Sequence, residues 1–316
     1  MTHAAGRWLL PALIALLVAL PLWSSAYLTS FFTVLFLYVA LAGGWNLFSG
    51  TTGYASLGHG LFFGIGAYGF AVSVVILDLN PVWAMLVAGS VAALGALLLG
   101  LVLLTTRIRV AYFAIVMLGF NEIAKTVVVN TKPLGSSYGL TIPPLPSSLI
   151  AYYFLLGLAT LVTVLAHLVL RSHWGIALKA IVADEVAAEA TGVRTVALKL
   201  AMFVMSGTLV GLAGAMIAWN WSYIDPYMAF DLVVSFEMVV MTMFGGIGSV
   251  WGPVLGAVAM AVLREVLSTS IPHFHAIIFG ILVMALILWA PGGIAEVARS
   301  LHRRFRKPRV VGEVTP

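Results

Sequence analysis

The chain has 316 residues, of which 62% are hydrophobic and only 9% are charged, and its mean hydropathy is +1.10. Soluble proteins carry about 25% charged residues, so this composition excludes an ordinary soluble domain and predicts an all-α polytopic membrane protein. The net charge of +5 comes from basic residues that flank apolar runs, which favours orientation in a lipid membrane over nucleic-acid binding. The absence of cysteine excludes disulfides, thiolate metal sites and cysteine nucleophiles.

Apolar runs long enough to cross a hydrocarbon core of about 30 Å predict about ten transmembrane helices. The predicted spans are residues 8–28, 31–49, 54–77, 81–104, 110–130, 149–170, 198–220, 232–249, 252–271 and 274–291. The first run could pass for a secretory signal, because Arg7 precedes it and small residues end it. We interpret it as a retained helix, because the chain inserts many more times and the run extends to Leu28.

The basic residues orient these spans. If the N-terminus is cytoplasmic, every Lys and Arg except Lys125, Lys132 and Arg264 lies in an inner segment, as the positive-inside rule requires. Both termini are therefore expected in the cytoplasm, with residues 1–298 forming one membrane domain and residues 299–316 a basic tail at the lipid headgroups.

One part of this count stays open. Residues 232–271 contain a helix-breaking run, GGIGSVWGP, at an uncharged inner turn. This region forms either two spans or a re-entrant hairpin, in which case the chain has eight spans plus the hairpin. Non-helical backbone at that depth must be covered by protein or water, because lipid offers no hydrogen-bond partners.

The chain has 31 glycines, and their positions predict one loop and several close helix contacts. Residues 131–148, TKPLGSSYGLTIPPLPSS, are rich in Pro, Gly and Ser and predict a long outer loop. Small residues at four-residue spacing predict close helix packing. They are Gly60 and Gly64, Gly207 and Gly211, and Gly248, Gly252 and Gly256.

Residues 171–199, RSHWGIALKAIVADEVAAEATGVRTVALK, are the polar interior segment long enough to meet a soluble partner. The segment carries four Lys or Arg and three acidic residues, and it also keeps Trp174, Leu178 and Ile181 at helical spacing. Asp184 is placed to cap a short helix and Gly192 to end it in a left-handed conformation. We expect a cytoplasmic docking element whose contact residues are Asp184, Glu185, Ala187, Ala188, Glu189 and Gly192.

Ionisable residues inside spans each cost about 2.5 to 3.5 kcal/mol at the centre, so they need a partner or an aqueous lining. The charged ones are Glu122, Lys125, Glu237, Arg264 and Glu265. Glu122 and Lys125 are three residues apart on one predicted helix and can pair. Pairing, or a position near the outer membrane surface, is one interpretation of this group, and a role in transport is the other.

His59 lies in a predicted span rich in small residues, without a charged neighbour in the sequence. It either packs against a neighbouring helix through a hydrogen bond or lines a polar path with Asn46, Ser49 and Ser56. A substrate with an ammonium and a carboxylate group would find hydrogen-bond partners in such a path. The candidate substrate-pathway residues are Asn46, Ser56, His59, Asn121 and Glu122.

Motifs for enzymatic chemistry are missing from the sequence. It has no HExxH metal pair and no GxSxG elbow, and His273 and His275 are interpreted as loop residues. It also has no GxxxxGK[ST] phosphate loop, so another subunit must hydrolyse ATP if transport is ATP-driven. We therefore expect a transport subunit with no cofactor or metal of its own.

Several long motifs carry a resemblance to a known family. They are Gly53-Tyr54, SLGHGLFFGIGAY from Ser56, LGFNEI from Leu118, YGLTIPP from Tyr138, the loop from Arg171, and FGGIGSVWGPVLGA from Phe244. Together they resemble the branched-chain amino acid ABC transporter permeases of the LivM type. The resemblance implies an inner-membrane subunit of a bacterial importer, moving branched-chain or other hydrophobic amino acids from periplasm to cytoplasm.

The resemblance also implies partners and a coupling loop. The partners are a second, LivH-like permease, two cytoplasmic ATPase subunits that hold ATP and Mg, and a periplasmic substrate-binding protein. Residues 171–199 would be the EAA-type loop that inserts a short helix into the ATPase. Ala187, Ala188 and Gly192 match the AAxxxG part of its motif, whereas Val186 stands at the position of its glutamate.

Two other functions remain as alternatives. Relatives of this family include urea and amide importers, and substrate choice rests largely with the binding protein. An ion-coupled secondary transporter is the second alternative, suggested by Glu122 and His59 inside spans. Such a carrier would work alone, whereas an ABC permease would be inert without ATPase subunits.

Overall fold

The structure is a computed structural model that describes residues 14–106, 108–270 and 280. Residues 14–19 are helical. The elements that follow are η1 (Leu20–Leu22), α2 (Ala26–Trp45), the π-helix η2 (Asn46–Gly50), α3 (Gly60–Val75), α4 (Pro81–Thr105), α5 (Val110–Val129), η3 (Lys132–Leu134), η4 (Ser136–Tyr138), β1 (Leu140–Thr141), α6 (Ser148–Arg171), α7 (His173–Ala183), α8 (Glu185–Ala190), α9 (Thr195–Trp221), β2 (Tyr223–Ile224), α10 (Pro226–Ala229), α11 (Leu232–Gly245) and α12 (Gly252–Ser270). Apart from residue 280, the predicted span 274–291 lies outside the described residues, as do the tail 299–316, His273 and His275.

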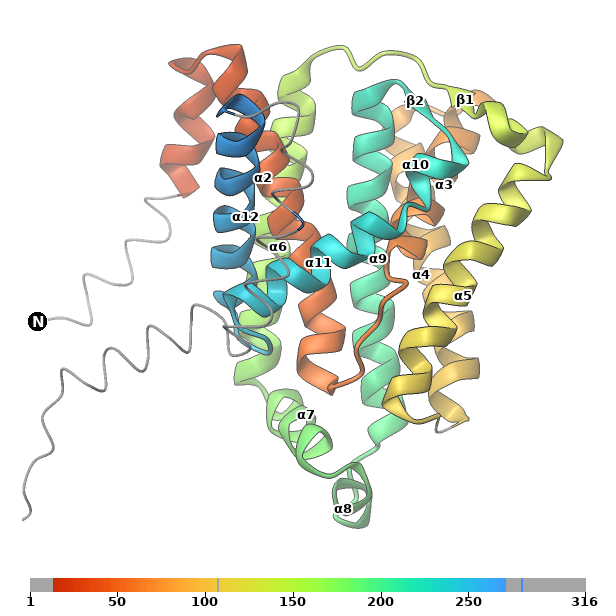
Figure 1. The fold of residues 1–316 in the computed structure, drawn as a ribbon, viewed down its shortest axis with the longest axis vertical. Helices are drawn as coiled ribbons and strands as arrows, with labels where there is room; N and C mark the ends of the chain where they lie inside the picture. The colour runs from red at the N-terminus through yellow and green to blue at the C-terminus, as the bar shows by residue number, and fades with distance from the viewer. Residues whose placement is uncertain (1–13, 107, 271–279, 281–316) are drawn as a thin grey trace, which may run out of the picture.

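The described helices form a bundle with two distinct ends (Figure 1). α7 and α8 project from one end, which we call the α8 end. At the opposite end, called the far end, β1 pairs antiparallel with β2, a short strand pair that the sequence did not predict. Seven segments of the described chain are long and apolar enough to cross a membrane. The polytopic helical class is thus supported, while seven such segments stand beside the ten spans expected over the full chain.

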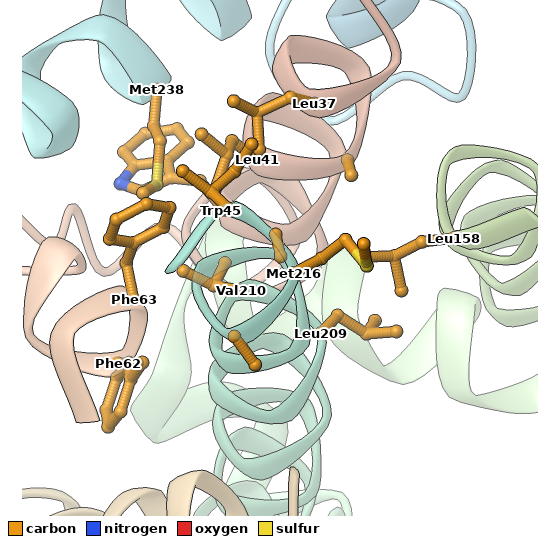
Figure 2. Close-up of a cluster of buried hydrophobic side chains, with 14 of the residues drawn as sticks. Leu37, Leu41, Trp45, Phe62, Phe63, Leu158, Leu209, Val210, Met216 and Met238 are labelled. Carbon is orange, nitrogen blue, oxygen red and sulfur yellow. The ribbon is translucent and has the colours of Figure 1, made fainter. Parts of the chain in front are cut away.

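α9 lies at the centre of the bundle and contacts α2, α3, α4 and α6 (Figure 1). Its sequence is apolar on all sides, which suits a helix buried by neighbours around its whole circumference. Figure 2 shows side chains of α2, α3, α6, α9 and α11 meeting in one buried cluster, among them Leu41, Phe63, Leu158 and Val210. This packing fixes the frame on which the polar groups described below are held.

The boundary between the first two predicted spans, 8–28 and 31–49, is wrong by several residues. The helical turn that contains Pro21 ends before residue 24, and α2 begins directly after Ser25. Proline cannot donate a backbone hydrogen bond, and the Ser25 side chain accepts the N–H of Leu28 at 3.4 Å as an N-cap. These local signals outweigh the continuous apolar run.

The predicted span 54–77 is wrong in its first part, because α3 begins only at Gly60. Residues 53–59 form what we call the extended segment, which runs from the α8 end into the bundle without helical structure (Figure 1). Gly53 begins it with a φ of +79°. Gly58 passes so close to α5 that an added Cβ would lie 2.0 Å from the Met117 carbonyl oxygen. Protein therefore covers this irregular backbone, as a membrane interior requires.

The open region 232–271 contains two helices, α11 and α12, joined by residues 246–251. Gly246 and Gly248 have φ values of +116° and +70°, which explains why the chain turns at the glycine run. The segments Pro226–Gly245 and Gly252–Thr269 are each long and apolar enough to be spans. α11 runs obliquely across the bundle in Figure 1.

Most residues of the small-residue patterns lie at helix contacts, as expected, whereas Gly248 lies in the turn between α11 and α12. A Cβ added at Gly211 on α9 would lie 2.3 Å from the Cβ of Ala92 on α4. A Cβ added at Gly256 on α12 would lie 1.8 Å from the carbonyl oxygen of Met241 on α11. Such distances are far below van der Waals contact, so these helices approach each other through glycine.

Candidate functional site

α8 is a short helix that is capped at both ends. Asp184 Oδ1 accepts hydrogen bonds from two backbone N–H groups of the first turn, at 2.9 and 3.0 Å. Gly192 has a φ of +90°, and its N–H donates to the Glu189 carbonyl at 2.9 Å. The next N–H donates to the Ala188 carbonyl at 3.1 Å, which completes a Schellman motif. The expected cap at Asp184 and stop at Gly192 are confirmed.

The two faces of α8 differ in exposure. Ala188 is buried against the bundle, whereas Val186 is 76% exposed. On the preceding α7, Leu178 and Ile181 are buried, whereas Trp174 is half exposed. The exposed residues of α8 include Val186, Ala187 and Ala190. α8 therefore presents a narrow surface of small apolar side chains at the end of the molecule.

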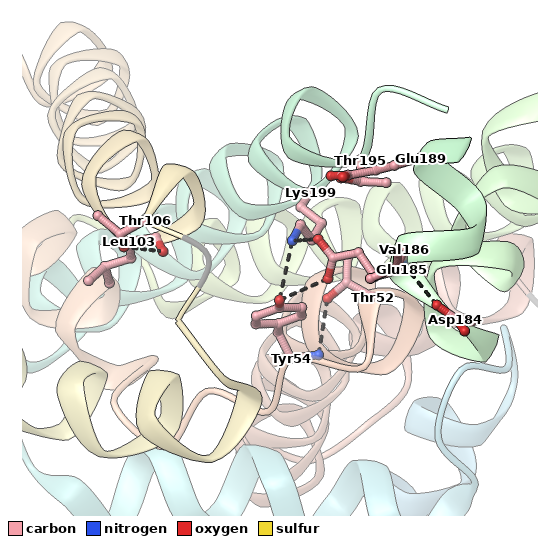
Figure 3. A network of polar contacts seen from close by, with 10 residues as sticks. All are labelled: Thr52, Tyr54, Leu103, Thr106, Asp184, Glu185, Val186, Glu189, Thr195 and Lys199. Atoms are coloured by element: carbon pink, nitrogen blue, oxygen red, sulfur yellow. Dashed lines mark hydrogen bonds and ion pairs between the residues drawn. The ribbon is translucent and has the colours of Figure 1, made fainter. Parts of the chain in front are cut away.

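A buried polar network ties α8 to the bundle (Figure 3). Lys199 on α9 has no exposed side-chain surface, and its ammonium group forms an ion pair with Glu185 on α8. The Tyr54 hydroxyl donates to Glu185 Oε2 at 2.9 Å, and Lys199 Nζ donates to the Tyr54 hydroxyl at 3.3 Å. Lys199 Nζ also lies 4.4 Å from the centroid of the Tyr54 ring. α8, α9 and the extended segment thus meet at one carboxylate.

The electrostatics of Glu185 follow from these contacts. Burial by itself raises the pKa of its carboxyl group, but the hydrogen bonds from Lys199 and Tyr54 and the charge of Lys199 outweigh that effect. The net result is a pKa below the ordinary value of 4.5, so the carboxylate stays ionised at neutral pH.

The second acid of α8 also faces the bundle. Glu189 Oε1 accepts a hydrogen bond from the Thr195 hydroxyl at 2.7 Å. Glu185 and Glu189 were predicted as contact residues for a soluble partner, but both carboxylates bind groups at the base of α9. Among the predicted contact residues, Ala187 is the exposed one within α8 itself.

Ser56 lies in the extended segment and not on a helix, contrary to the prediction. Its N–H donates to Ser49 Oγ at 3.2 Å, and its carbonyl accepts from Trp45 Nε1 at 2.7 Å. Its hydroxyl is buried without a hydrogen-bond partner among the described residues. Side chains of α2 and η2 therefore replace the helical hydrogen bonds that the extended segment lacks.

Asn46 joins the π-helix η2 to the turn between α11 and α12. Its Nδ2 donates to the Ser249 carbonyl at 3.0 Å, and its Oδ1 accepts the N–H of Gly248 at 2.8 Å. The amide is fully buried and has its main groups satisfied by backbone. In this conformation the Asn46 side chain holds η2 against the turn between α11 and α12 through two hydrogen bonds.

His59 ends the extended segment and is fully buried. The Ser206 hydroxyl donates to the Gly44 carbonyl at 2.6 Å, so its oxygen accepts the proton of His59 Nε2, also at 2.6 Å. His59 Nδ1 has no partner among the described residues. The rings of Phe62 and Phe203 pack against the imidazole, with centroids 5.1 and 5.9 Å away.

The last two pathway candidates lie on α5 and differ in environment. Asn121 is buried, and its Nδ2 donates to the Phe230 carbonyl at 2.8 Å. Glu122 is partly exposed and pairs with Lys125 at 2.6 Å, as the three-residue spacing predicts. The structure thus places Asn46, Ser56, His59 and Asn121 in the interior, whereas Glu122 lies on an outer face of α5.

Comparison with known proteins identifies the class. A family model described as "Branched-chain amino acid transport system / permease component" matches residues 27–288, which is most of the chain. The chain belongs to this family. The high-affinity branched-chain amino acid permease proteins LivM of Escherichia coli K12 and Salmonella typhimurium LT2 are each 29% identical over 322 residues. These alignments cover 92% of this chain and 75% of each relative. No solved structure matches the chain.

The permease is therefore a transport subunit of an ABC importer and not an enzyme. Its family and its seven apolar segments describe a multi-pass membrane protein. Membership implies that it works with ATPase and binding-protein partners.

Tyr54 and Lys199 of the permease were missed as functional candidates. Lys199 was counted as a basic residue of the loop, although it lies in the first turns of an apolar helix. A lysine inside an apolar pattern, with an acid at the start of a nearby short helix, was the available signal. Tyr54 carried no such signal, because its contact with Glu185 depends on the path of the extended segment.

Proposed function

We propose that this permease carries branched-chain or similar hydrophobic amino acids from the periplasm to the cytoplasm across a bacterial inner membrane. The observation that carries the proposal is the family match over residues 27–288, with two relatives named for high-affinity branched-chain amino acid transport. The α8 end is then the cytoplasmic side, and both termini are cytoplasmic. The distribution of Lys and Arg supports this orientation.

The proposed complex contains a second, LivH-like permease, two cytoplasmic ATPase subunits and a periplasmic binding protein, and this chain itself also contacts membrane lipid. ATP and Mg bind the ATPase subunits, because this sequence has no phosphate loop. Reconstitution tests the whole proposal: vesicles with the complete set should take up leucine only with ATP. Uptake by this chain alone, or uptake abolished by a protonophore despite ATP, would identify a secondary carrier. Urea uptake in place of leucine would identify an amide importer.

The contact with the ATPase is proposed at the exposed face of α8. Ala187 and Val186 point away from the bundle and leave room for a close approach to a groove. The rest of the predicted set holds this surface in place: Asp184 and Gly192 cap the helix, Ala188 packs inward, and the two acids bind α9. α8 is a docking helix whose charged residues serve its attachment and not its contact.

The polar network supports a route for transmitting motion inward. Glu185 is bonded both to Lys199 on α9 and to Tyr54 at the start of the extended segment. The extended segment ends at His59, which is bonded to Ser206 on α9 in the interior. A displacement of α8 by the ATPase would therefore move the extended segment relative to α9. Because that segment lacks helical hydrogen bonds, it can shift more easily than an intact helix.

Replacing Gly192 by proline should uncouple ATP hydrolysis from uptake. Proline cannot adopt the φ of +90° at this position. It would also remove the N–H that donates to the Glu189 carbonyl at the C-terminal end of α8. We expect leucine uptake to fall about tenfold, which corresponds to a loss of about 1.4 kcal/mol of coupling free energy. The ATPase should continue to hydrolyse ATP. Uptake and phosphate release are measured in the same vesicles.

The matched control is Gly192→Asn, because asparagine tolerates the left-handed conformation and nothing lies within 4 Å of an added Cβ. This variant should keep most of its uptake. Normal uptake by Gly192→Pro, with the protein inserted in normal amount, would refute the docking role of α8.

Replacing His59 by leucine separates a pathway role from a packing role. If His59 belongs to the substrate path, uptake falls several-fold while the amount of assembled complex is unchanged. Leucine keeps the contacts with Phe62 and Phe203 but loses the hydrogen bond to Ser206. Complex recovered by affinity purification is measured beside uptake. A fall in complex alone assigns His59 to packing.

A further inference from the structure

A cavity of about 740 Å³ lies between α2, α9, α11 and α12. α9 and α12 contribute turns near the far end, α2 contributes residues from Tyr27 to Leu41, and α11 contributes its first two turns (Figure 1). Tyr27, Trp221, Asp231 and Ser268 mark these parts of the lining. The volume is typical of small-molecule pockets, which span about 300 to 1,000 Å³. The cavity lies on the opposite side of the bundle from α8.

Charges of both signs line this cavity. Arg264 on α12 is 51% exposed and pairs with Glu237 on α11 at 3.1 Å. Arg264 also donates to the Tyr38 hydroxyl, and Asp231 lies at the start of α11. Both described bonds of Arg264 use Nη1. A guanidinium has three further N–H groups, enough for a second, bidentate partner.

The deeper wall of the cavity is apolar. It consists of Leu37 and Leu41 of α2, Phe63 of α3 and Ile217 of α9, beside Val234 of α11. Leu37, Leu41 and Phe63 belong to the buried cluster in Figure 2, so their positions are fixed by packing. A rigid apolar wall next to a few charged groups is the usual composition of a small-molecule site.

We propose that this cavity is a binding site for a zwitterionic amino acid with an apolar side chain. Its carboxylate would bind the N–H groups of Arg264 that make no hydrogen bond among the described residues, its ammonium group would bind Glu237 and Asp231, and its side chain would lie against the apolar wall. This inference rests on the proposed function and adds to it a site within the permease on the side where an imported substrate arrives. It also gives a reason for placing several charges inside spans, which each cost about 2.5 to 3.5 kcal/mol at the centre.

The chain has no cysteine, so one introduced thiol reports on one position. Val34→Cys would place a thiol in the cavity lining, and Val82→Cys would place one on α4, outside the lining. Both variants are reconstituted with the partner subunits and treated with a membrane-impermeant maleimide. We expect leucine to slow labelling of Val34→Cys at least threefold and to leave Val82→Cys unchanged.

Two comparisons test whether both charges of the ligand are recognised. 4-Methylpentanoate lacks the ammonium group and 3-methylbutylamine lacks the carboxylate, so each should protect less than leucine. Adding Arg264→Gln to Val34→Cys should abolish protection by leucine. Equal protection by all three compounds, or protection that survives Arg264→Gln, would overturn the proposed recognition.

The remaining outcomes separate the cavity from the transport function. If leucine is imported but does not slow labelling of Val34→Cys, the cavity is not the site and the proposed function stands. If Val34→Cys is not labelled at all, protein or lipid fills the cavity and the site is refuted. If leucine is not imported, the proposed function fails, while protection by leucine would still support the cavity.

Discussion

Replacing Glu185 by alanine should destabilise the permease by about 3 to 5 kcal/mol, because it leaves a buried charge without its partner. The Lys199 side chain has no exposed surface, so its ammonium group cannot reach water in the folded protein. The Tyr54 hydroxyl loses its acceptor in the same variant. Thermal denaturation of the detergent-solubilised protein, followed by tryptophan fluorescence, measures the loss.

Replacing Lys199 by methionine should cost clearly less than replacing Glu185. The Glu185 carboxylate would remain, but it keeps 27% of its surface exposed and can be hydrated. Lys179→Met, at an exposed position on α7, is the matched control and should leave stability unchanged. The double variant Glu185→Leu with Lys199→Met removes both charges and should recover part of the loss. An equal loss for Glu185→Ala and Lys199→Met would refute this asymmetry.

Acid should act on the same pair. Because the pKa of Glu185 is lower in the folded protein than its ordinary value of 4.5, ionisation of this carboxyl favours the folded state. This contribution is complete above about pH 4.5 and is lost as the pH falls through the lowered pKa. The stability difference between the wild-type protein and Glu185→Ala should shrink over that acid range.

The features of α8 that could be predicted from the sequence are those that depend on residues adjacent in the sequence. Asp184 as a cap and Gly192 as a stop follow from rules about a few consecutive residues, and both are confirmed. The direction of the Glu185 side chain was not predictable in this way. It depends on Lys199 and Tyr54, which reach Glu185 through the packing of α9 and the extended segment.

The fold shows the same division. Most apolar runs became helices near their predicted positions, because a membrane leaves few other ways to satisfy backbone hydrogen bonds. The extended segment is the exception within the predicted span 54–77. The backbone N–H and carbonyl of Ser56 in this segment form hydrogen bonds with the side chains of Ser49 and Trp45, which belong to preceding elements. The sequence of the segment itself does not predict these contacts.

Replacing Gly66 by alanine should be among the most disruptive changes of a single methyl group in the bundle core. A Cβ at this position on α3 would lie 1.9 Å from the carbonyl oxygen of Gly211 on α9. That neighbour is backbone and cannot rotate away, so the two helices would have to separate. Overpacking typically costs about 1 to 3 kcal/mol and occasionally more; we expect a loss at or above the upper value, because α9 is central and packs against α2, α3, α4 and α6.

Gly157 on α6 supplies a control that isolates the steric cost. Nothing lies within 4 Å of a Cβ added there, so Gly157→Ala changes helix propensity without a clash. Propensity favours alanine over glycine by about 1 kcal/mol in a helix interior, and this gain applies to both variants. The difference in denaturation temperature between Gly66→Ala and Gly157→Ala therefore measures the contact between α3 and α9. Equal stability of the two variants would mean that α3 and α9 lie farther apart than the 1.9 Å between an added Cβ at Gly66 and the Gly211 carbonyl oxygen implies. A large difference in denaturation temperature would show that α9 is held against α3 by glycine contacts. The extended segment and its polar network would then depend on this packing of α3 and α9.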